Sequence, residues 1–219
     1  MRASPASART IGFLGLGSIA VILSGTAVTS LSYSGWTGES YSPLNHFVSE
    51  LGEAGTSRLA LAFNFGILLG GIGLGVFLML LSRRLTGRYR FAFVVAGVVA
   101  GISGSLVGVF PMDIPALHRA ASGVFFMTGW LVAAIFSLWL LAAPRPSFSR
   151  FLIVPGGLTV GVFALFLAVY STYRPVDANA HIGVREAIWS VPLLEWAALL
   201  SLLLWFGCVA TALLTSRPD

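Results

Sequence analysis

Residues 58–82, with the sequence RLALAFNFGILLGGIGLGVFLMLLS, contain one charged side chain, Arg58 at the first position, and are otherwise almost entirely apolar. An α-helix rises about 1.5 Å per residue, so about 20 such residues cross the hydrocarbon core of a bilayer, which is roughly 30 Å thick. The stretch is therefore long enough to span a membrane. Asn64 is its strongly polar interior residue, and such residues usually face the bundle interior or a wet cavity.

Five further stretches of the same kind occur along the chain, at residues 10–32, 91–111, 119–142, 151–173 and 189–214. Of the 219 residues, 57% are hydrophobic and only 10% are charged, whereas about a quarter of the residues in a soluble domain carry charge. The connections are short and no apolar run is left over. The sequence therefore predicts an all-α polytopic membrane protein, with residues 1–219 forming a single integral membrane domain built as a bundle of six transmembrane helices.

The first apolar stretch has a second interpretation, because Arg2 and Arg9 precede it as they would precede the apolar core of a secretory signal peptide. The run from Ile11 to Leu31 is longer than the roughly 7–15 residues of such a core, and no Ala-x-Ala site follows it. We therefore expect an uncleaved first helix. Cleavage would leave five helices with the same orientation.

The positive charges lie mostly on one side of the predicted bundle. The chain contains no lysine, and nine of its thirteen arginines fall at the termini or after the second and fourth stretches, at Arg2, Arg9, Arg83, Arg84, Arg88, Arg90, Arg145, Arg150 and Arg217. The positive-inside rule assigns that side to the cytoplasm. Both termini of a multi-pass cell-membrane protein are thus predicted to be cytoplasmic. The net charge of +5 then reflects topology and anionic lipid heads, and no nucleic-acid partner is expected.

The acids and histidines lie mostly on the opposite side. Seven of eight acids and all three histidines fall in or beside the connections after the first, third and fifth stretches: Glu39, His46, Glu50, Glu53, Asp113, His118, Asp177, His181, Glu186 and Glu195. Acidic residues contribute little to membrane topology, so the positive-inside rule does not explain this enrichment. It predicts a polar pocket on the outer face.

The first of these connections is residues 41–53, YSPLNHFVSELGE. If a short helix forms there, His46, Ser49 and Glu50 stand at positions i, i+3 and i+4, which places them on one helical face. These three side chains are therefore predicted to converge on one ligand.

The other two connections show similar spacings. Asp113 precedes His118 by five residues and is close enough to orient its imidazole as a base or a metal ligand, and Arg119 follows at the helix start. In the third connection His181, Arg185 and Glu186 stand at i, i+4 and i+5, again roughly on one face, and they are predicted to bind the same ligand.

Several motifs together resemble a known family. They are YSPLNHFVSELGE at 41–53, Asn64, GVFPMDIPALHRAASGVFF at 108–126, and the pair Glu195 and Trp196. From about residue 12 to 210 the chain resembles the bacterial six-helix membrane proteins grouped as domain of unknown function 998 (DUF998). It is more distantly similar to the Frag/DRAM/Sfk membrane family, whose matching positions are Ser49, Gly52, Asn64, His118, Glu195 and Trp196. The resemblance to the bacterial family implies no activity. Some members of the Frag/DRAM/Sfk family, which is eukaryotic, are implicated in remodelling glycolipid anchors, so the more distant similarity implies lipid chemistry.

The principal hypothesis is hydrolysis or acyl transfer on a membrane lipid. His118 would act as base and Asp113 would orient it, with Ser49 as the nucleophile or Asn64 as an oxyanion donor. Glu195, costly within a spanning helix, would pair with Arg119 or Arg185 or close the pocket. In a metal-dependent variant, His46, His118 and His181 would bind zinc together with Asp113 or Glu50, and an open position on the metal would activate water. No short zinc motif such as HExxH is present.

Two other functions remain open. Asn64 and Glu195 inside the bundle, below an outer vestibule of acids and histidines, would suit a transporter for a cation or small solute. The halves of the helices nearer the cytoplasm carry almost no ionisable residues, which argues against a polar path through the membrane. A non-catalytic scaffold that binds lipid is the third interpretation. The sequence leaves the oligomeric state open.

Overall fold

The computed structural model describes residues 5–172 and 185–215. Six long helices follow one another along the chain: α1 (Pro5–Leu31), α2 (Ala60–Leu81), α3 (Gly87–Val109), α4 (Pro115–Ala142), α5 (Ile153–Thr172) and α6 (Ser190–Thr215). Three short 3₁₀ helices lie between them: η1 (Val48–Gly52), η2 (Ser82–Arg84) and η3 (Arg150–Leu152). Within the described ranges there is no strand, so the predicted all-α class is confirmed.

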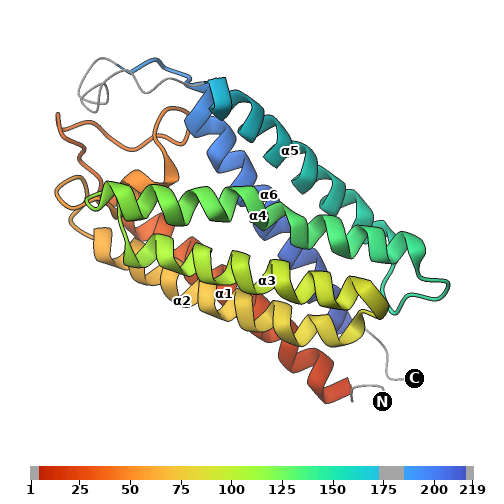
Figure 1. Ribbon diagram of the computed structural model, residues 1–219. Helices are drawn as coiled ribbons and strands as arrows, with labels where there is room; N and C mark the ends of the chain where they lie inside the picture. The colour runs from red at the N-terminus through yellow and green to blue at the C-terminus, as the bar shows by residue number, and fades with distance from the viewer. Residues whose placement is uncertain (1–4, 173–184, 216–219) are drawn as a thin grey trace.

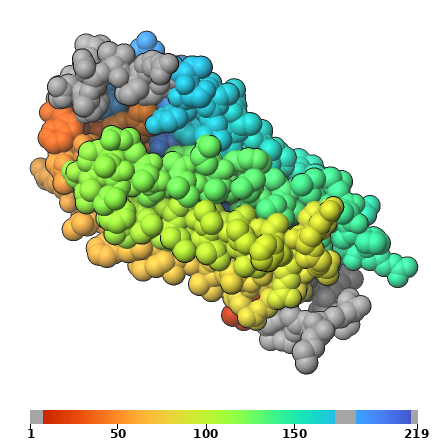
Figure 2. Space-filling model, viewed as in Figure 1, coloured from red at the N-terminus to blue at the C-terminus, as the bar shows by residue number. Residues whose placement is uncertain are grey.

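Each long helix overlaps one of the predicted apolar stretches, with both ends within five residues of it, and is long and apolar enough to cross a membrane. Large apolar side chains are exposed on the outside of the bundle, among them Phe13, Leu61, Phe91, Met127, Val154 and Leu204. Figure 2 shows one long side of the molecule, where no other helix covers α3, α4 and α5. These surfaces suit lipid contact, and the six helices make this a multi-pass membrane protein.

The helices form a closed ring of neighbours. Each packs against the next along the chain, and α1 also packs against α6 (Figure 1). Glycine brings α2 and α3 close together, because a Cβ on Gly101 would lie only 2.9 Å from the Cα of Gly75. Such small residues allow helix backbones to approach closely in lipid, where packing drives association.

The two ends of the bundle carry opposite charges. Near one end, called the basic end below, lie Arg83, Arg84, Arg88, Arg90, Arg145 and Arg150, where α1 begins and α6 ends (Figure 1). Near the other, the acidic end, lie Glu39, Glu50, Glu53, Asp113, Glu186 and Glu195. The half nearer the basic end is filled by fully buried rings, including Phe77, Phe93, Phe136 and Trp205. The candidate functional residues lie in the other half.

Candidate functional site

Residues 41–53, called the strap below, pack over the acidic end of the bundle. The helix η1 within the strap contacts α1, α2 and α6. The strap is also bound to the segment before α6: the Asn45 side-chain amide donates to the Glu186 carbonyl at 2.9 Å, and the Trp189 N–H donates to the Leu44 carbonyl at 2.8 Å. Segments about 140 residues apart in sequence are therefore held together here.

Glu50 of the strap forms a buried ion pair with Arg185, which lies in the segment before α6. The guanidinium donates from Nη2 to Oε2 at 2.8 Å and from Nη1 to Oε1 at 3.1 Å. The carboxylate also accepts hydrogen bonds from the Phe47 N–H at 2.9 Å and the Tyr33 hydroxyl at 3.1 Å. Arg185 Nη1 also donates to the Asn45 carbonyl. The pair is bidentate, and both carboxylate oxygens are fully engaged, whereas Nε of Arg185 is buried without a partner among the described residues.

His46 lies beside this pair and is only 2% exposed. Its Nδ1 is 2.7 Å from the side-chain oxygen of Asn45, and its ring contacts the rings of Tyr33 and Tyr41. Burial, together with the positive charge of Arg185, lowers the pKa of His46 below its ordinary value of 6.5. Within the described part of the chain, Nε2 of this neutral imidazole is buried without a partner.

The three predicted strap ligands do not share one face. The helical segment starts only at Val48 and is a 3₁₀ helix, in which residues recur every three positions instead of every 3.6. Glu50 therefore faces Arg185, whereas the Ser49 hydroxyl lies 3.3 Å from the Met112 sulfur, and Ser49 also lines an internal cavity. The expected convergence of His46, Ser49 and Glu50 on one ligand is not seen.

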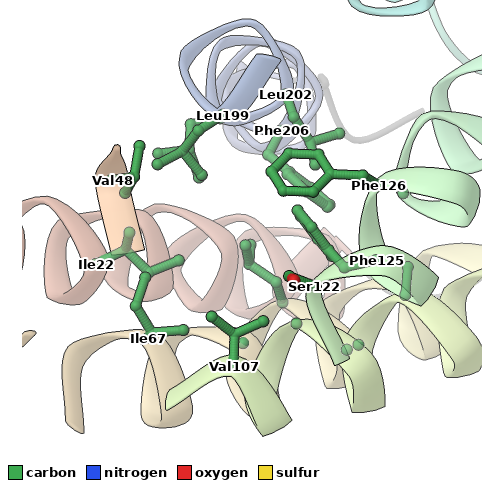
Figure 3. Close-up of a pocket in the computed structure, with 18 of the residues that line it drawn as sticks. Ile22, Val48, Ile67, Val107, Ser122, Phe125, Phe126, Leu199, Leu202 and Phe206 are labelled. Carbon is green, nitrogen blue, oxygen red and sulfur yellow. The ribbon is translucent and has the colours of Figure 1, made fainter. Parts of the chain in front are cut away.

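That cavity lies between α1, α2, α3, α4 and α6 and has the strap residues Val48 and Ser49 at one end. It contains about 890 Å³ of empty space, its open part included. Figure 3 shows apolar side chains from several helices pointing into it, among them Phe125 and Phe126 from α4 and Leu199 from α6. Four polar side chains complete the lining: Ser49, His118, Ser122 and Glu195.

His118 is buried at the start of α4, with its backbone N–H bonded to the Ile114 carbonyl. The Nδ1 atom lies 2.8 Å from the carbonyl oxygen of Phe110, an atom that can only accept. Nδ1 therefore carries the proton, and in the neutral imidazole Nε2 is left as a hydrogen-bond acceptor. Because His118 lines the cavity, this arrangement leaves a hydrogen-bond acceptor at its polar end.

Glu195 also lines the cavity and is 7% exposed. Its Oε2 accepts a hydrogen bond from the Val48 N–H at 2.7 Å, which links α6 to the strap. The next residue contributes a second link, because the Trp196 indole N–H donates to the Tyr41 hydroxyl at 2.9 Å. The predicted pairing of Glu195 with Arg185 is not seen, since that guanidinium binds Glu50.

Asp113 does not orient His118. Its two carboxylate oxygens lie 2.9 and 3.2 Å from the Ala54 N–H, so it accepts a hydrogen bond from the chain just after the strap. The carbonyl of Phe110 takes the expected orienting role instead, because the turn before α4 directs Asp113 outward while His118 points into the bundle. Arg119, the next residue on α4, is exposed on the surface.

The remaining predicted residues have structural contacts or lie outside the described ranges. Asn64 donates from Nδ2 to the Gly52 carbonyl at 2.9 Å, which ties α2 to the end of the strap, and its Oδ1 is buried without a partner in the described ranges. Glu186 is exposed, and its backbone carbonyl holds Asn45. His181 lies outside the described residues.

No group of three or more metal-binding side chains forms among the residues that the structure describes. The three-histidine zinc site includes His181, so it stays a prediction. His46 and His118 meet different partners, the Tyr33 and Tyr41 rings in one case and the Phe110 carbonyl in the other.

Two side chains of the site were not singled out from the sequence. Tyr33 binds the buried Glu50, but it stands at the end of an apolar run where an interfacial aromatic is common, so nothing marks it. Ser122 lines the cavity one turn after His118 and donates to the His118 carbonyl at 2.8 Å. The i, i+4 spacing of these two residues is a signal that could have identified Ser122.

A family model described as "Protein of unknown function (DUF998)" matches residues 21–212. The chain belongs to the DUF998 family. This match confirms the resemblance drawn from the strap, Asn64, the 108–126 motif and the adjacent residues Glu195 and Trp196. The matched residues include both the strap and the residues that line the cavity of this DUF998 protein. Searches of curated proteins and of solved structures gave no match. The more distant similarity to the Frag/DRAM/Sfk family stays a prediction.

Proposed function

We propose that this DUF998 protein binds the acyl chain of a membrane lipid inside its bundle, with the polar group of the lipid held beside His118 and Glu195. The observation that carries the proposal is the lining of the cavity, which is apolar along its length and polar only near the strap. A pocket lined by apolar groups with a few convergent polar ones is typical of ligand sites.

The length of the cavity supports one chain. His118 and Val132 both line it and lie 14 positions apart on α4, a rise of about 21 Å. Glu195 and Phe206 line it from α6 and lie about 16 Å apart by the same rise. The acyl chains of one leaflet span half of the roughly 30 Å hydrocarbon core, which is about 15 Å. The cavity is therefore long enough for one such chain.

The position of the polar residues argues against transport of a solute. All four polar side chains of the described lining lie near the strap, and the lining further along is made of residues such as Leu78, Val132 and Leu203. A cation or small solute would find no polar group there to replace its water. An alkyl chain needs none.

The test uses the full-length protein in nanodiscs and a photoactivatable hexadecanol with its diazirine at the chain end. We expect the probe to label lining residues such as Val132, and the label to disappear in a Gly129→Leu variant. A Cβ on Gly129, which lines the cavity, would make only ordinary contacts with Phe125, the nearest at 3.4 Å, and a larger side chain would enter the space that the chain needs.

The matched control is Gly123→Leu. Gly123 lies on the same helix but is exposed, and a Cβ there meets nothing within 4 Å. This variant should keep the internal label. Labelling confined to lipid-facing residues, and unchanged by either substitution, would exclude the cavity as a binding site.

Hydrolysis or acyl transfer on the bound lipid is the second candidate, and the tautomer of His118 favours it. Nε2 is free to accept a proton at the polar end of the cavity, as a general base requires. Ser49 lines the same end and would be the nucleophile after leaving Met112. Release of product from a long-chain ester should be lost in His118→Ala, and equal turnover by that variant would exclude a base at this position.

We also propose that the chain is a single integral membrane domain of the cell membrane, with the basic end and both termini in the cytoplasm. The arginines at the basic end support this orientation. Single cysteines placed at Arg88 and at Glu39, in a Cys208→Ser background, should react with an impermeant thiol reagent from opposite sides of the membrane. Reaction of both from the same side would contradict the orientation.

A further inference from the structure

Among the described residues, the polar end of the cavity contains a buried acidic side chain, Glu195, without a counter-charge. Glu195 is 7% exposed, and in the described part of the chain its side chain accepts one hydrogen bond, from a neutral backbone N–H. Arg185, the cation beneath the strap, makes a bidentate bond to Glu50 and does not line the cavity. Of the two buried carboxylates at this end, Glu50 therefore has the guanidinium, and Glu195 has no cation bound to it among the described residues.

The ionised form of an acid buried without a counter-charge is unfavourable, and it is stabilised when a cation binds beside it. Charged side chains inside membrane bundles are retained where they meet a partner or a ligand. For Glu195 that partner would have to enter through the cavity that the side chain lines.

The other polar groups of the lining are also acceptors. The Nδ1–H of His118 is used by the Phe110 carbonyl, so Nε2 accepts. The hydroxyl protons of Ser49 and Ser122 point to the Met112 sulfur and the His118 carbonyl, which leaves their oxygens as acceptors. Among the described lining side chains no free N–H donor remains. A phosphate or carboxylate head would find no free N–H donor in the described lining and would lie against the acidic side chain of Glu195.

We propose that the cavity selects a single-chain amphiphile whose head is a cationic hydrogen-bond donor, that is, a long-chain ammonium. The alkyl chain would occupy the apolar lining, and the ammonium would bind Glu195 with its remaining protons directed to His118 Nε2. This inference rests on the acyl-chain site proposed above and specifies the chemistry of the head that the site accepts.

The experiment is competition against the photoactivatable hexadecanol probe in zwitterionic nanodiscs, with hexadecylammonium, hexadecanol and hexadecanoate as competitors. Hexadecylammonium should displace the probe at a concentration at least about tenfold lower than hexadecanoate, the ratio expected when a charge-assisted hydrogen bond is gained. Partition into the bilayer differs between the three amphiphiles. The decisive quantity is therefore the change in this ratio between the wild type and a variant.

In Glu195→Gln the advantage of the ammonium over the alcohol should disappear, because the charge is removed. The amide oxygen of glutamine can still accept the Val48 N–H, so the strap remains attached to α6. The matched control is Glu39→Gln, which removes one negative charge from the acidic end at a residue that binds Thr37 and does not line the cavity. This control should keep the wild-type ratio.

Two results would overturn the inference while leaving the acyl-chain site in place. One is displacement by hexadecanoate at the same or lower concentration than hexadecylammonium in the wild type. The other is an ammonium-to-alcohol ratio that does not change in Glu195→Gln. Failure of all three amphiphiles to displace the probe, or a probe that never labels the interior, would exclude the proposed function and the inference together.

Discussion

Glu50 and Glu195 are two carboxylates buried to nearly the same extent at the same end of the bundle, with exposed fractions of 4% and 7%. Their surroundings differ. Within the part of the chain that the structure describes, Glu50 accepts four hydrogen bonds, two of them from the guanidinium of Arg185. Glu195 accepts one, from the Val48 N–H, and faces a cavity.

The difference indicates that burial alone does not identify a functional acid. A carboxylate that is paired and fully hydrogen-bonded has exchanged its water for protein groups and contributes to the structure. A carboxylate with unused acceptor capacity beside an internal space has capacity left for a ligand. On this basis we propose that Glu50 holds the strap in place and that Glu195 belongs to the binding site.

The largest expected loss of stability is at Glu50, the carboxylate that is paired with Arg185. In Glu50→Ala the Arg185 guanidinium is left buried without its partner, and breaking a buried pair in this way costs about 3–5 kcal/mol of unfolding free energy. Thermal unfolding in detergent should therefore shift strongly to lower temperature. Glu186→Ala is the control, because Glu186 is exposed, and it should unfold like the wild type. Equal decreases in unfolding temperature in the two variants would contradict a structural role for the ion pair.

A smaller loss is expected at the other carboxylate. Glu195→Ala leaves the Val48 N–H without its acceptor, which costs about 1–3 kcal/mol for a buried donor. Glu195→Gln restores an acceptor and should regain most of this stability. If Glu195→Ala destabilises the protein as much as Glu50→Ala, or if glutamine fails to restore stability, the two carboxylates do not differ as described.

The smallest effect is a pH dependence that arises beside the Glu50 pair. The pKa of His46 is lowered in the folded state, first by burial and then by Arg185, so the unfolded state binds the proton more readily. Stability contributed by neutral His46 is complete above the ordinary pKa of 6.5 and is lost as the pH falls below it, towards the folded-state pKa.

Unfolding temperatures measured between about pH 7.5 and about pH 5.5 test this expectation. The decrease towards lower pH should be shallower in His46→Gln than in the wild type. A decrease of the same slope in both would show that other groups carry the pH dependence.

The helices could be predicted from the sequence because the bilayer imposes a simple requirement on the chain. Every backbone polar group within the hydrocarbon core must be satisfied inside its own segment, so an apolar run of about 20 residues forms a helix regardless of its neighbours. The run at 58–82 contains helix α2, which the structure places at Ala60–Leu81. The small difference at each end is the usual uncertainty of a helix boundary.

The sequence predicted which residues gather at the acidic end but not which side chains contact one another there. Charge counts along the chain placed Glu50, Glu195, His118 and Arg185 at one end, and the structure places them there. Sequence spacing also favoured contacts between near neighbours, such as Asp113 with His118, and this contact does not form. A turn of a few residues can direct two side chains that are close in sequence to opposite sides, and their spacing in the sequence does not indicate these directions.

The sequence by itself determined that six apolar segments cross a membrane and that acids and histidines gather at one end, because both properties are sums over local composition. The tertiary structure alone decided which carboxylate is paired. Arg185 stands 135 residues from Glu50 and only ten from Glu195, yet it binds Glu50. The strap folds over the bundle and brings the Glu50 carboxylate to the guanidinium. Glu195 lies in α6, on the side of the helix that lines the cavity, and binds the Val48 N–H instead.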